Sequence, residues 1–410
     1  MEKEIYLLIL GIIIFGFLFE QFLQYLNKTR WSSQIPDELK NIYDPEKYQK
    51  QQLYEKANYN FDIISGSFSF LIMLLMLIFY GFAWVDSISR SIVDHPVWTA
   101  LIFFGILMFA SQLIMIPFSL YGTFVIEEKF GFNKTTVKTW IFDLFKGWIL
   151  GAVIGGGLMA LIIWIYYQTQ EMFWIYAWLA ISGFMIFMAM FYSSLIVPLF
   201  NKQTPLEDGE LRTAIEEFSK KAGFKLNNIY KIDGSKRSTK ANAYFSGFGP
   251  KKRIVLYDTL IQDMEVNELV AVLAHEIGHY KKKHTISSIL LSVLQTGITL
   301  YILSLFIGNP VFSKALGVDN HSFHIGILSF GILYSPISMV LGLGLNILSR
   351  KNEFAADRYA AENYNSRSLS DSLKKLSVKN LSNLTPHPLY VFFNYSHPPL
   401  LERLRALSKY

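Results

Sequence analysis

No cysteine occurs among the 410 residues of the sequence. Disulfide bonds, cysteine metal ligands, a cysteine nucleophile and palmitoylation are therefore excluded, and the redox compartment stays undetermined. Charged residues are also scarce, at 17% of the chain, whereas soluble domains carry about 25%. Hydrophobic residues make up 52%, a surplus for which a soluble domain of this length has no use. Composition alone thus favours a membrane protein.

The apolar residues are gathered into long runs, each with the roughly 20 residues that a helix needs to cross a bilayer core. The first run lacks both a basic leading segment and a small-x-small cleavage site, so we interpret it as a retained anchor rather than a signal peptide. The runs predict an all-α multi-pass membrane protein with seven spans, at residues 5–23, 63–85, 97–121, 144–166, 173–200, 286–307 and 325–348.

Lysine and arginine are unevenly distributed between the connections. The connections after the second, fourth and sixth runs contain only Arg90 and Lys314. The connections after the first and third runs contain Lys28, Arg30, Lys40, Lys47, Lys50, Lys56, Lys129, Lys134 and Lys138. This asymmetry predicts an N-terminus outside and a C-terminus in the cytoplasm, in a bacterial cytoplasmic membrane or, in a eukaryote, the endoplasmic reticulum. Cations flanking spans also explain the net charge of +6, so no nucleic-acid partner is inferred.

Two regions follow from the spacing of the runs. Residues 1–200 contain the first five spans and their loops, including a polar stretch at 31–60 expected to form short helices. Residues 201–410 contain the last two spans, the segment 201–285 and a polar tail. Within that segment the pattern predicts helices at 206–224 and 266–282 and strands at 229–233, 242–248 and 253–258. The second region is therefore expected to hold a small α+β domain.

The second predicted helix carries the sequence His275-Glu276-Ile277-Gly278-His279, which matches H-E-x-x-H. A spacing of four places both imidazoles on one helix face, where they can bind one Zn²⁺. Glu276 lies one step around the helix, so its carboxylate can take a proton from a water at the metal. The alternative is a surface helix end with two exposed histidines. The regular helix favours the metal site.

A catalytic zinc needs a third protein ligand, and no further histidine follows at the usual spacing. Glu353 is the best candidate, and Asp357, four residues later, is expected to hydrogen-bond a ligand imidazole. The histidine pair precedes span six and Glu353 follows span seven, so two crossings return the chain to the same side of the membrane. A solvated acidic helix surface is the alternative, which this topology disfavours.

Two further residues of the tail lie on the same predicted side as the metal ligands. An imidazole or cation near the metal, from His397 or Arg403, could stabilise the oxyanion that forms during peptide hydrolysis. A single histidine beside prolines is more often a turn residue, so the sequence by itself leaves both interpretations open.

Taken together, these motifs resemble the integral-membrane CaaX prenyl proteases. The resemblance covers nearly the whole chain in order: seven spans, the His275–His279 motif, Glu353 to Asp357, and Ser396-His397-Pro398-Pro399 followed by Arg403. Additional matches are the polar stretch after the first span, Glu128-Lys129-Phe130-Gly131-Phe132-Asn133, and the segment from Ser235 to Gly247 with Asn242-Ala243-Tyr244-Phe245.

The resemblance implies a barrel of seven helices around an intramembrane chamber, capped on the cytoplasmic side by a zincin-like domain. It implies an endopeptidase with one Zn²⁺ per chain that removes three residues from prenylated C-terminal CaaX sequences. Glu276 is then the general base, and His275, His279 and Glu353 are the ligands. Asn242, His397 and Arg403 would line the cleft, and residues 242–245 would pair with the substrate backbone.

Two other hypotheses remain open on the sequence. A quality-control metalloprotease that degrades misfolded membrane proteins shares the catalytic design, although such proteases are typically shorter and have fewer spans. A seven-span receptor or transporter is disfavoured by the intact H-E-x-x-H motif. The predicted partners are thus the lipid bilayer and a peptide or protein substrate, with a prenylated C-terminus favoured.

Overall fold

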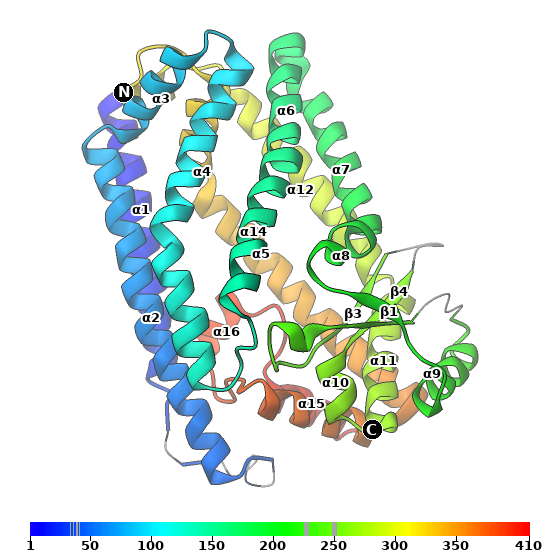
Figure 1. Cartoon of the computed structure of the whole chain (residues 1–410). Coiled ribbons are helices and arrows are strands. Elements are labelled where there is room, and N and C mark those ends of the chain that lie inside the picture. Colours follow the sequence, from blue (N-terminus) through cyan, green and yellow to red (C-terminus); the bar gives the residue numbers. More distant parts are fainter. Residues whose placement is uncertain (33, 36, 38–39, 41, 225–228, 248–251) are drawn as a thin grey trace.

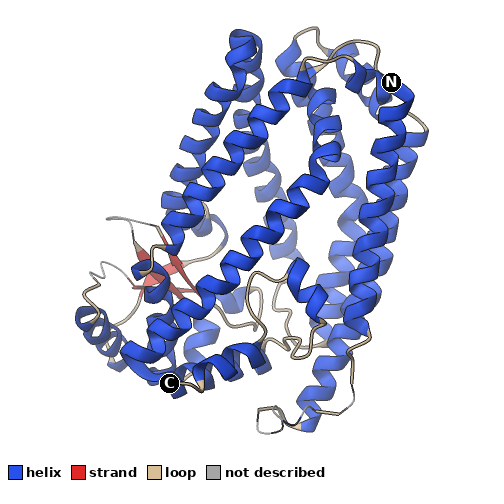
Figure 2. Cartoon of the chain, turned by 180° about the vertical axis from the view of Figure 1, so that it is seen from behind, coloured by secondary structure: helices blue, strands red, loops and turns tan. Residues whose placement is uncertain are grey.

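The computed structural model of the chain describes residues 1–32, 34–35, 37, 40, 42–224, 229–247 and 252–410. Long helices run side by side through most of its length, and a small sheet with short helices lies at one end (Figures 1 and 2). The N-terminus lies at the end of the bundle opposite the sheet, and the C-terminus lies near the sheet (Figure 1). The predicted strand 242–248 reaches Phe248, which is outside the described residues.

Within the described residues, six helical stretches are long and apolar enough to cross a membrane: Glu2–Lys28, Pro45–Ile78, Pro96–Glu127, Val137–Phe200, His284–Ile307 and Phe323–Lys379. The fourth stretch folds back on itself near Gln170, whose φ is 44°. Its arms, α5–α6 (Val137–Leu150 and Gly156–Thr169) and α7 (Phe173–Leu195), pack against each other. The expected number of seven spans is therefore recovered only when these two arms are counted separately.

The second predicted span has different limits in the structure. Helix α2 (Pro45–Ile78) begins within the polar stretch that was expected to form short helices, because the Asp44 side chain caps it and Pro45 occupies its first turn. It ends before the predicted limit at residue 85. The chain turns at Tyr80, with a φ of 51°, into the separate helix α3 (Gly81–Ile92).

The end of the bundle far from the sheet is fixed by a buried polar pair. His324 Nε2 lies 2.5 Å from Asp86 Oδ1, which joins the first turn of α14 (Phe323–Ala360) to α3. Arg90 Nε donates to the other oxygen of Asp86 at 2.8 Å, and its Nη2 donates to Ser322 Oγ. Because the buried groups satisfy one another, α3 is held across the end of the bundle.

The sheet has four strands in the order β1-β2-β4-β3. Strands β2 (Ile229–Ile232) and β4 (Arg253–Tyr257) are parallel, while β1 (Gln203–Pro205) and β3 (Ala243–Ser246) add to them antiparallel. The sequence did not predict β1, because three residues ending in proline are too short for an alternating pattern. Strand β3 lies at an edge of the sheet, so one side of its backbone is unpaired by the sheet.

One helix organises the core of this domain. Helix α11 (Val266–Lys281) packs against α14, α15 (Ser366–Lys379) and α9 (Glu210–Lys221). A capping box of Glu265 and Glu268 fixes its start, and Lys375 of α15 binds Glu268 at 2.7 Å. The buried side chains of Leu273 and Ile277 belong to the hydrophobic core of this domain.

The remaining elements are α1 (Glu2–Lys28), α4 (Pro96–Tyr121), η2 (Gly122–Glu127), η3 (Gly151–Gly155), η4 (Gln170–Met172), α8 (Val197–Phe200), η5 (Gly234–Lys236), α10 (Asp258–Asp263), α12 (His284–Ile307), α13 (Val311–Ala315), η7 (Ala361–Asn365), α16 (Pro388–Asn394) and α17 (Leu400–Leu407).

Candidate metal centre

Helices α11 and α14 approach each other unusually closely at a glycine. A Cβ atom at Gly278 would lie 3.1 Å from both the Cα and the carbonyl oxygen of Ala356. Any larger residue at this position would push the two helices apart. The close approach places the H-E-x-x-H segment beside the part of α14 that carries Glu353, as the two-crossing argument predicts. Helix α14 is one continuous helix from the span into this motif.

Three side chains meet at this crossing with their donor atoms facing one another. His275 Nε2 lies 3.1 Å from His279 Nε2. The carboxylate of Glu353 lies 3.4 Å from the first of these nitrogens and 3.2 Å from the second. His275 and Glu353 are buried, and His279 is half-buried. One donor atom from each residue lies within 4.8 Å of the others, a grouping that can hold one metal ion.

The chemistry of this cluster fits a divalent cation. The Oε2 atom of Glu353 is buried and has no hydrogen-bond partner among the described residues. A buried carboxylate oxygen without a partner is costly unless a cation satisfies it. Burial by itself would lower the pKa of His275, but the adjacent carboxylates of Asp357 and Glu353 outweigh it and raise that pKa to about 9. The cluster thus attracts positive charge, which is the property that a metal site needs.

Further charged groups surround the three candidate ligands and hold them in place. Asp357 Oδ1 lies 2.8 Å from His275 Nδ1, so the carboxylate sits on the ring nitrogen that faces away from Glu353. Arg403 of α17 binds Asp357 with two hydrogen bonds, Nε to Oδ2 at 2.8 Å and Nη2 to Oδ1 at 2.6 Å. Its Nη1 is also 3.6 Å from Glu353. With 12% of its side chain exposed, Arg403 lies behind the ligands rather than open to a substrate.

The other predicted site residues surround this centre at different distances. His397 Nε2 lies 3.4 Å from Glu353 Oε1, and 66% of its side chain is exposed. Glu276 is half-buried on α11 and makes no hydrogen bond or ion pair with a described residue. Asn242 is exposed just before β3, where its side chain accepts a hydrogen bond from the Ala243 amide. Strand β3 packs against α11, but Asn242 forms no hydrogen bond with the three candidate ligands in the described part of the chain.

One histidine of the site was missed by the spacing argument. The Nδ1 atoms of His279 and His284 lie 3.0 Å apart, on the side of the His279 ring away from His275. His284 stands at the start of α12, directly after the turn at Lys283, whose φ is 59°. A partner on Nδ1 orients the His279 ring so that Nε2 faces the metal position. A spacing of five gives no helical signal, because the turn separates the two residues.

A polar clamp ties the membrane helices to the loop before β3. Lys240 Nζ lies 2.9 Å from both Tyr54 Oη of α2 and Glu127 Oε2 of η2. The Tyr54 hydroxyl donates to the other oxygen of Glu127 at 2.5 Å. Next to the clamp, Ala241 exchanges two hydrogen bonds with the Asn380 side chain. The clamp and Asn380 therefore fix the backbone that leads into Asn242.

Replacing Lys240 by methionine should loosen this loop and raise the KM for peptide substrates on the order of tenfold, because misplacing a binding segment by about 1 Å is costly. The metal content should stay at the wild-type value, since no ligand is touched. Lys202→Met, a change of the same type near β1, serves as the control. A KM for Lys240→Met equal to that of the control would show that the clamp does not position the substrate.

The fold and the site define an integral-membrane metalloendopeptidase of the H-E-x-x-H type. Residues 24–202 match the family model for the CAAX prenyl protease N-terminal region with five membrane helices, and residues 205–410 match that of peptidase family M48. The chain belongs to the CAAX prenyl protease family within peptidase family M48.

Similar proteins extend over nearly the full chain. It is 35% identical to CAAX prenyl protease 1 homolog of Arabidopsis thaliana, over 98% of this chain and 96% of that protein. It is also 35% identical to CAAX prenyl protease 1 of Saccharomyces cerevisiae, over 98% and 95%. The crystal structure of S. mikatae Ste24p superposes with a TM-score of 0.93 at 34% identity, covering 98% of this chain and 99% of that one.

Proposed function

We propose that this protein removes the last three residues of prenylated proteins that end in a CaaX sequence, using one zinc ion. The observation that carries the proposal is the full-length similarity to CAAX prenyl proteases, together with the His275, His279 and Glu353 cluster at the end of the bundle. A quality-control role has no comparable support, because no feature of the site points to misfolded substrates.

Zinc is favoured by the donor set. Two imidazoles and one carboxylate, without sulfur, are typical of a catalytic zinc site, which leaves a further position for water or substrate. In this role His275, His279 and Glu353 would hold the ion. Zinc supplies a Lewis acid that acidifies water and polarises the scissile carbonyl. Imidazole nitrogens suit zinc, whereas Mg²⁺ and Ca²⁺ are better held by sites made of oxygen ligands alone.

The remaining chemistry belongs to the side chains. Glu276 accepts a proton from the attacking water, whose oxygen forms a bond to the carbonyl carbon. The carbon–nitrogen bond then breaks, and Glu276 returns the proton to the departing amine. Asp357 and Arg403 act as positioning residues that fix the His275 ring. The exposed His397, whose Nε2 lies 3.4 Å from Glu353 Oε1, would donate to the carbonyl oxygen as negative charge develops.

Substrate binding is assigned to the free edge of the sheet. Among the described residues strand β3 pairs only with β4, so its other side can add an extended peptide strand. Asn242 at its start would contact the same peptide. We infer that this end of the molecule faces the cytoplasm, since the lysine-rich connections lie at it and Arg90 lies at the opposite end. In a eukaryotic cell the membrane would be the endoplasmic reticulum.

Farnesylated and bare versions of one CaaX peptide should differ mainly in KM. A prenyl chain contributes roughly 0.8 kcal/mol per buried CH₂ to membrane partitioning and so concentrates the substrate near the site. The groups around the scissile bond are identical in the two peptides, so kcat should change little. Proline next to the scissile bond should suppress cleavage of both, because it removes a backbone donor to β3. Equal kcat/KM for the two peptides would contradict the CaaX assignment and favour the quality-control role.

A further inference from the structure

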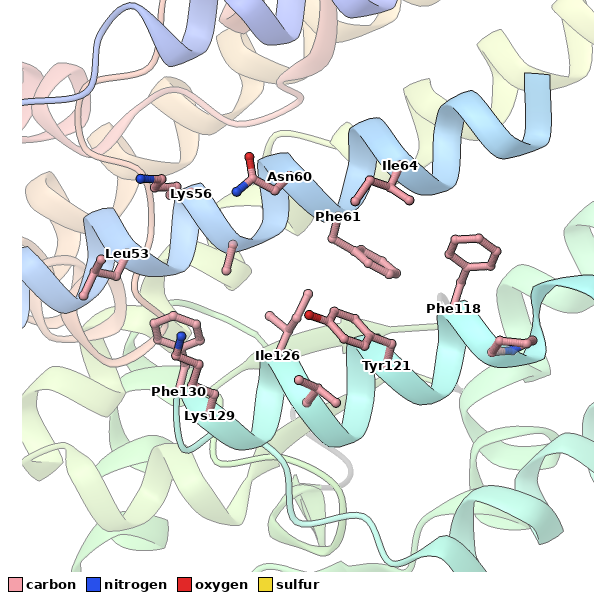
Figure 3. A pocket seen from close by; sticks show the side chains of 13 residues that line it. Leu53, Lys56, Asn60, Phe61, Ile64, Phe118, Tyr121, Ile126, Lys129 and Phe130 are labelled. Atoms are coloured by element: carbon pink, nitrogen blue, oxygen red, sulfur yellow. The ribbon is translucent and has the colours of Figure 1, made fainter. Parts of the chain in front are cut away.

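A groove lies between α2 and the segment formed by α4 and η2. Its volume is about 760 Å³, and Figure 3 shows side chains from both segments facing each other across it. Pro117 within α4 and the π-helical turns of η2 interrupt the regular helix along one wall. The walls are largely apolar, with Phe61, Ile64, Phe118, Tyr121, Val125 and Ile126.

The groove opens on the outer side of the bundle. The α2 residues that line it recur every three or four positions and so share one helix face: Leu53, Lys56, Ala57, Asn60, Phe61 and Ile64. Glu55 and Asp62 lie on the opposite face, in a separate cavity with Tyr390 and Tyr395. Tyr390 belongs to α16, which packs against α1 and α14 within the bundle. The groove face of α2 therefore points away from the bundle interior, toward lipid.

Charge is confined to one end of this groove. Lys56 and Lys129 lie at the same end in Figure 3, while Ile64 and Phe118 lie at the other. Neither lysine forms an ion pair with a carboxylate in the described part of the chain. Eight residues separate Lys56 from Ile64, so the apolar end lies about 12 Å deeper along α2. The groove is thus cationic near the membrane surface and apolar within the bilayer.

We propose that this groove binds one anionic phospholipid from the leaflet on the side of the metal site. The lipid phosphate lies between Lys56 and Lys129, and an acyl chain runs along Phe61 and Phe118. Basic pockets between transmembrane helices favour anionic head groups, whereas a zwitterionic lipid would leave the cationic end less satisfied. The proposal rests on the position and lining of the groove and does not depend on the proposed peptidase substrate.

The groove shares a wall with the clamp described above. Ile126 and Phe130 line the groove, and Glu127 between them binds Tyr54 and Lys240 on the other side of η2. The Phe130 ring also packs on the Tyr54 ring, with centroids 5.0 Å apart. An occupied groove would hold η2 against α2 and so support the loop that leads to Asn242.

Native mass spectrometry of the full-length protein in detergent, titrated with dioleoyl-phosphatidylserine or dioleoyl-phosphatidylcholine, tests the proposal. The wild type should retain one phosphatidylserine in preference to phosphatidylcholine. The double variant Lys56→Gln/Lys129→Gln should bind phosphatidylserine on the order of 30-fold more weakly, given two cations near the lipid phosphate. The matched control Lys134→Gln/Lys138→Gln removes two cations, one before α5 and one in its first turn, and should change binding less than about threefold.

A second variant tests the shape of the groove independently of its charge. Ala57 lines the groove, so Ala57→Phe fills it and keeps both lysines; bound phosphatidylserine should be lost while the protein still elutes as a folded monodisperse species. Equal retention of the two lipids by the wild type would overturn the proposal. Equal weakening by the two lysine pairs, or wild-type lipid binding by Ala57→Phe, would overturn it as well.

Discussion

Replacing Glu276 by glutamine is expected to lower kcat for peptide cleavage by about 10²–10⁴-fold, which is the usual contribution of a positioned general base. Glutamine has nearly the same shape but cannot accept the proton of the attacking water. The metal should stay in place at the wild-type stoichiometry, because His275, His279 and Glu353 are unchanged. Loss of activity with retained metal is the combination that identifies a base rather than a ligand.

Metal analysis and steady-state cleavage of the same preparation measure both quantities. Glu362→Gln, at an exposed position of η7, removes an equal charge away from the site and should leave both values unchanged. Loss of metal from Glu276→Gln would mean that Glu276 is itself a ligand. Activity above about a tenth of the wild-type value would show that another group takes the proton.

Replacing Glu353 by alanine is expected to remove both metal and activity. Its carboxylate is the only acidic group in the cluster of donor atoms that the described residues form, and its buried Oε2 atom accepts no hydrogen bond from them. Metal affinity should fall at least about 100-fold. Removing even a group that only hydrogen-bonds a metal ligand typically lowers metal affinity by about 10–100-fold. Asp357→Asn should give that smaller loss, because it weakens the support of His275 and leaves the ligands in place.

Equilibrium dialysis against a zinc-binding dye gives the affinities of the wild type, Glu353→Ala and Asp357→Asn. The predicted order of affinity is wild type, then Asp357→Asn, then Glu353→Ala. The reverse order of the two variants would assign the third ligand to Asp357. Stoichiometric zinc in Glu353→Ala would mean that two histidines and another group, such as His284, suffice.

The grouping of His275, His279 and Glu353 could be predicted from the sequence because its signals are local or topological. The spacing of His275 and His279 fixes one helix face, and α11 begins at Val266 as its periodicity indicates. The meeting of this helix with Glu353 followed from counting two crossings, although the close contact at Gly278 could not be foreseen. A glycine within a helix pattern indicates that another backbone can approach closely, but it does not indicate which one.

The features that were not predicted depend on contacts between distant segments. Tyr54, Glu127 and Lys240 come from three parts of the chain and show no pattern in any of them. His284 reaches His279 only because Lys283 adopts a left-handed conformation that turns the chain. The second predicted span, 63–85, extends beyond the end of α2 at Ile78 because α3 is also apolar along one face. Hydropathy measures composition and not the turn that separates two helices.

Anomalous diffraction at the zinc absorption edge, on crystals of the purified full-length protein, tests the central claim most directly. We expect one zinc peak per chain within bonding distance of His275 Nε2, His279 Nε2 and the Glu353 carboxylate. Asp357 should contact His275 Nδ1 and not the zinc. A peak between His279 and His284, or a fully loaded active protein without a peak at this crossing of α11 and α14, would contradict the assignment.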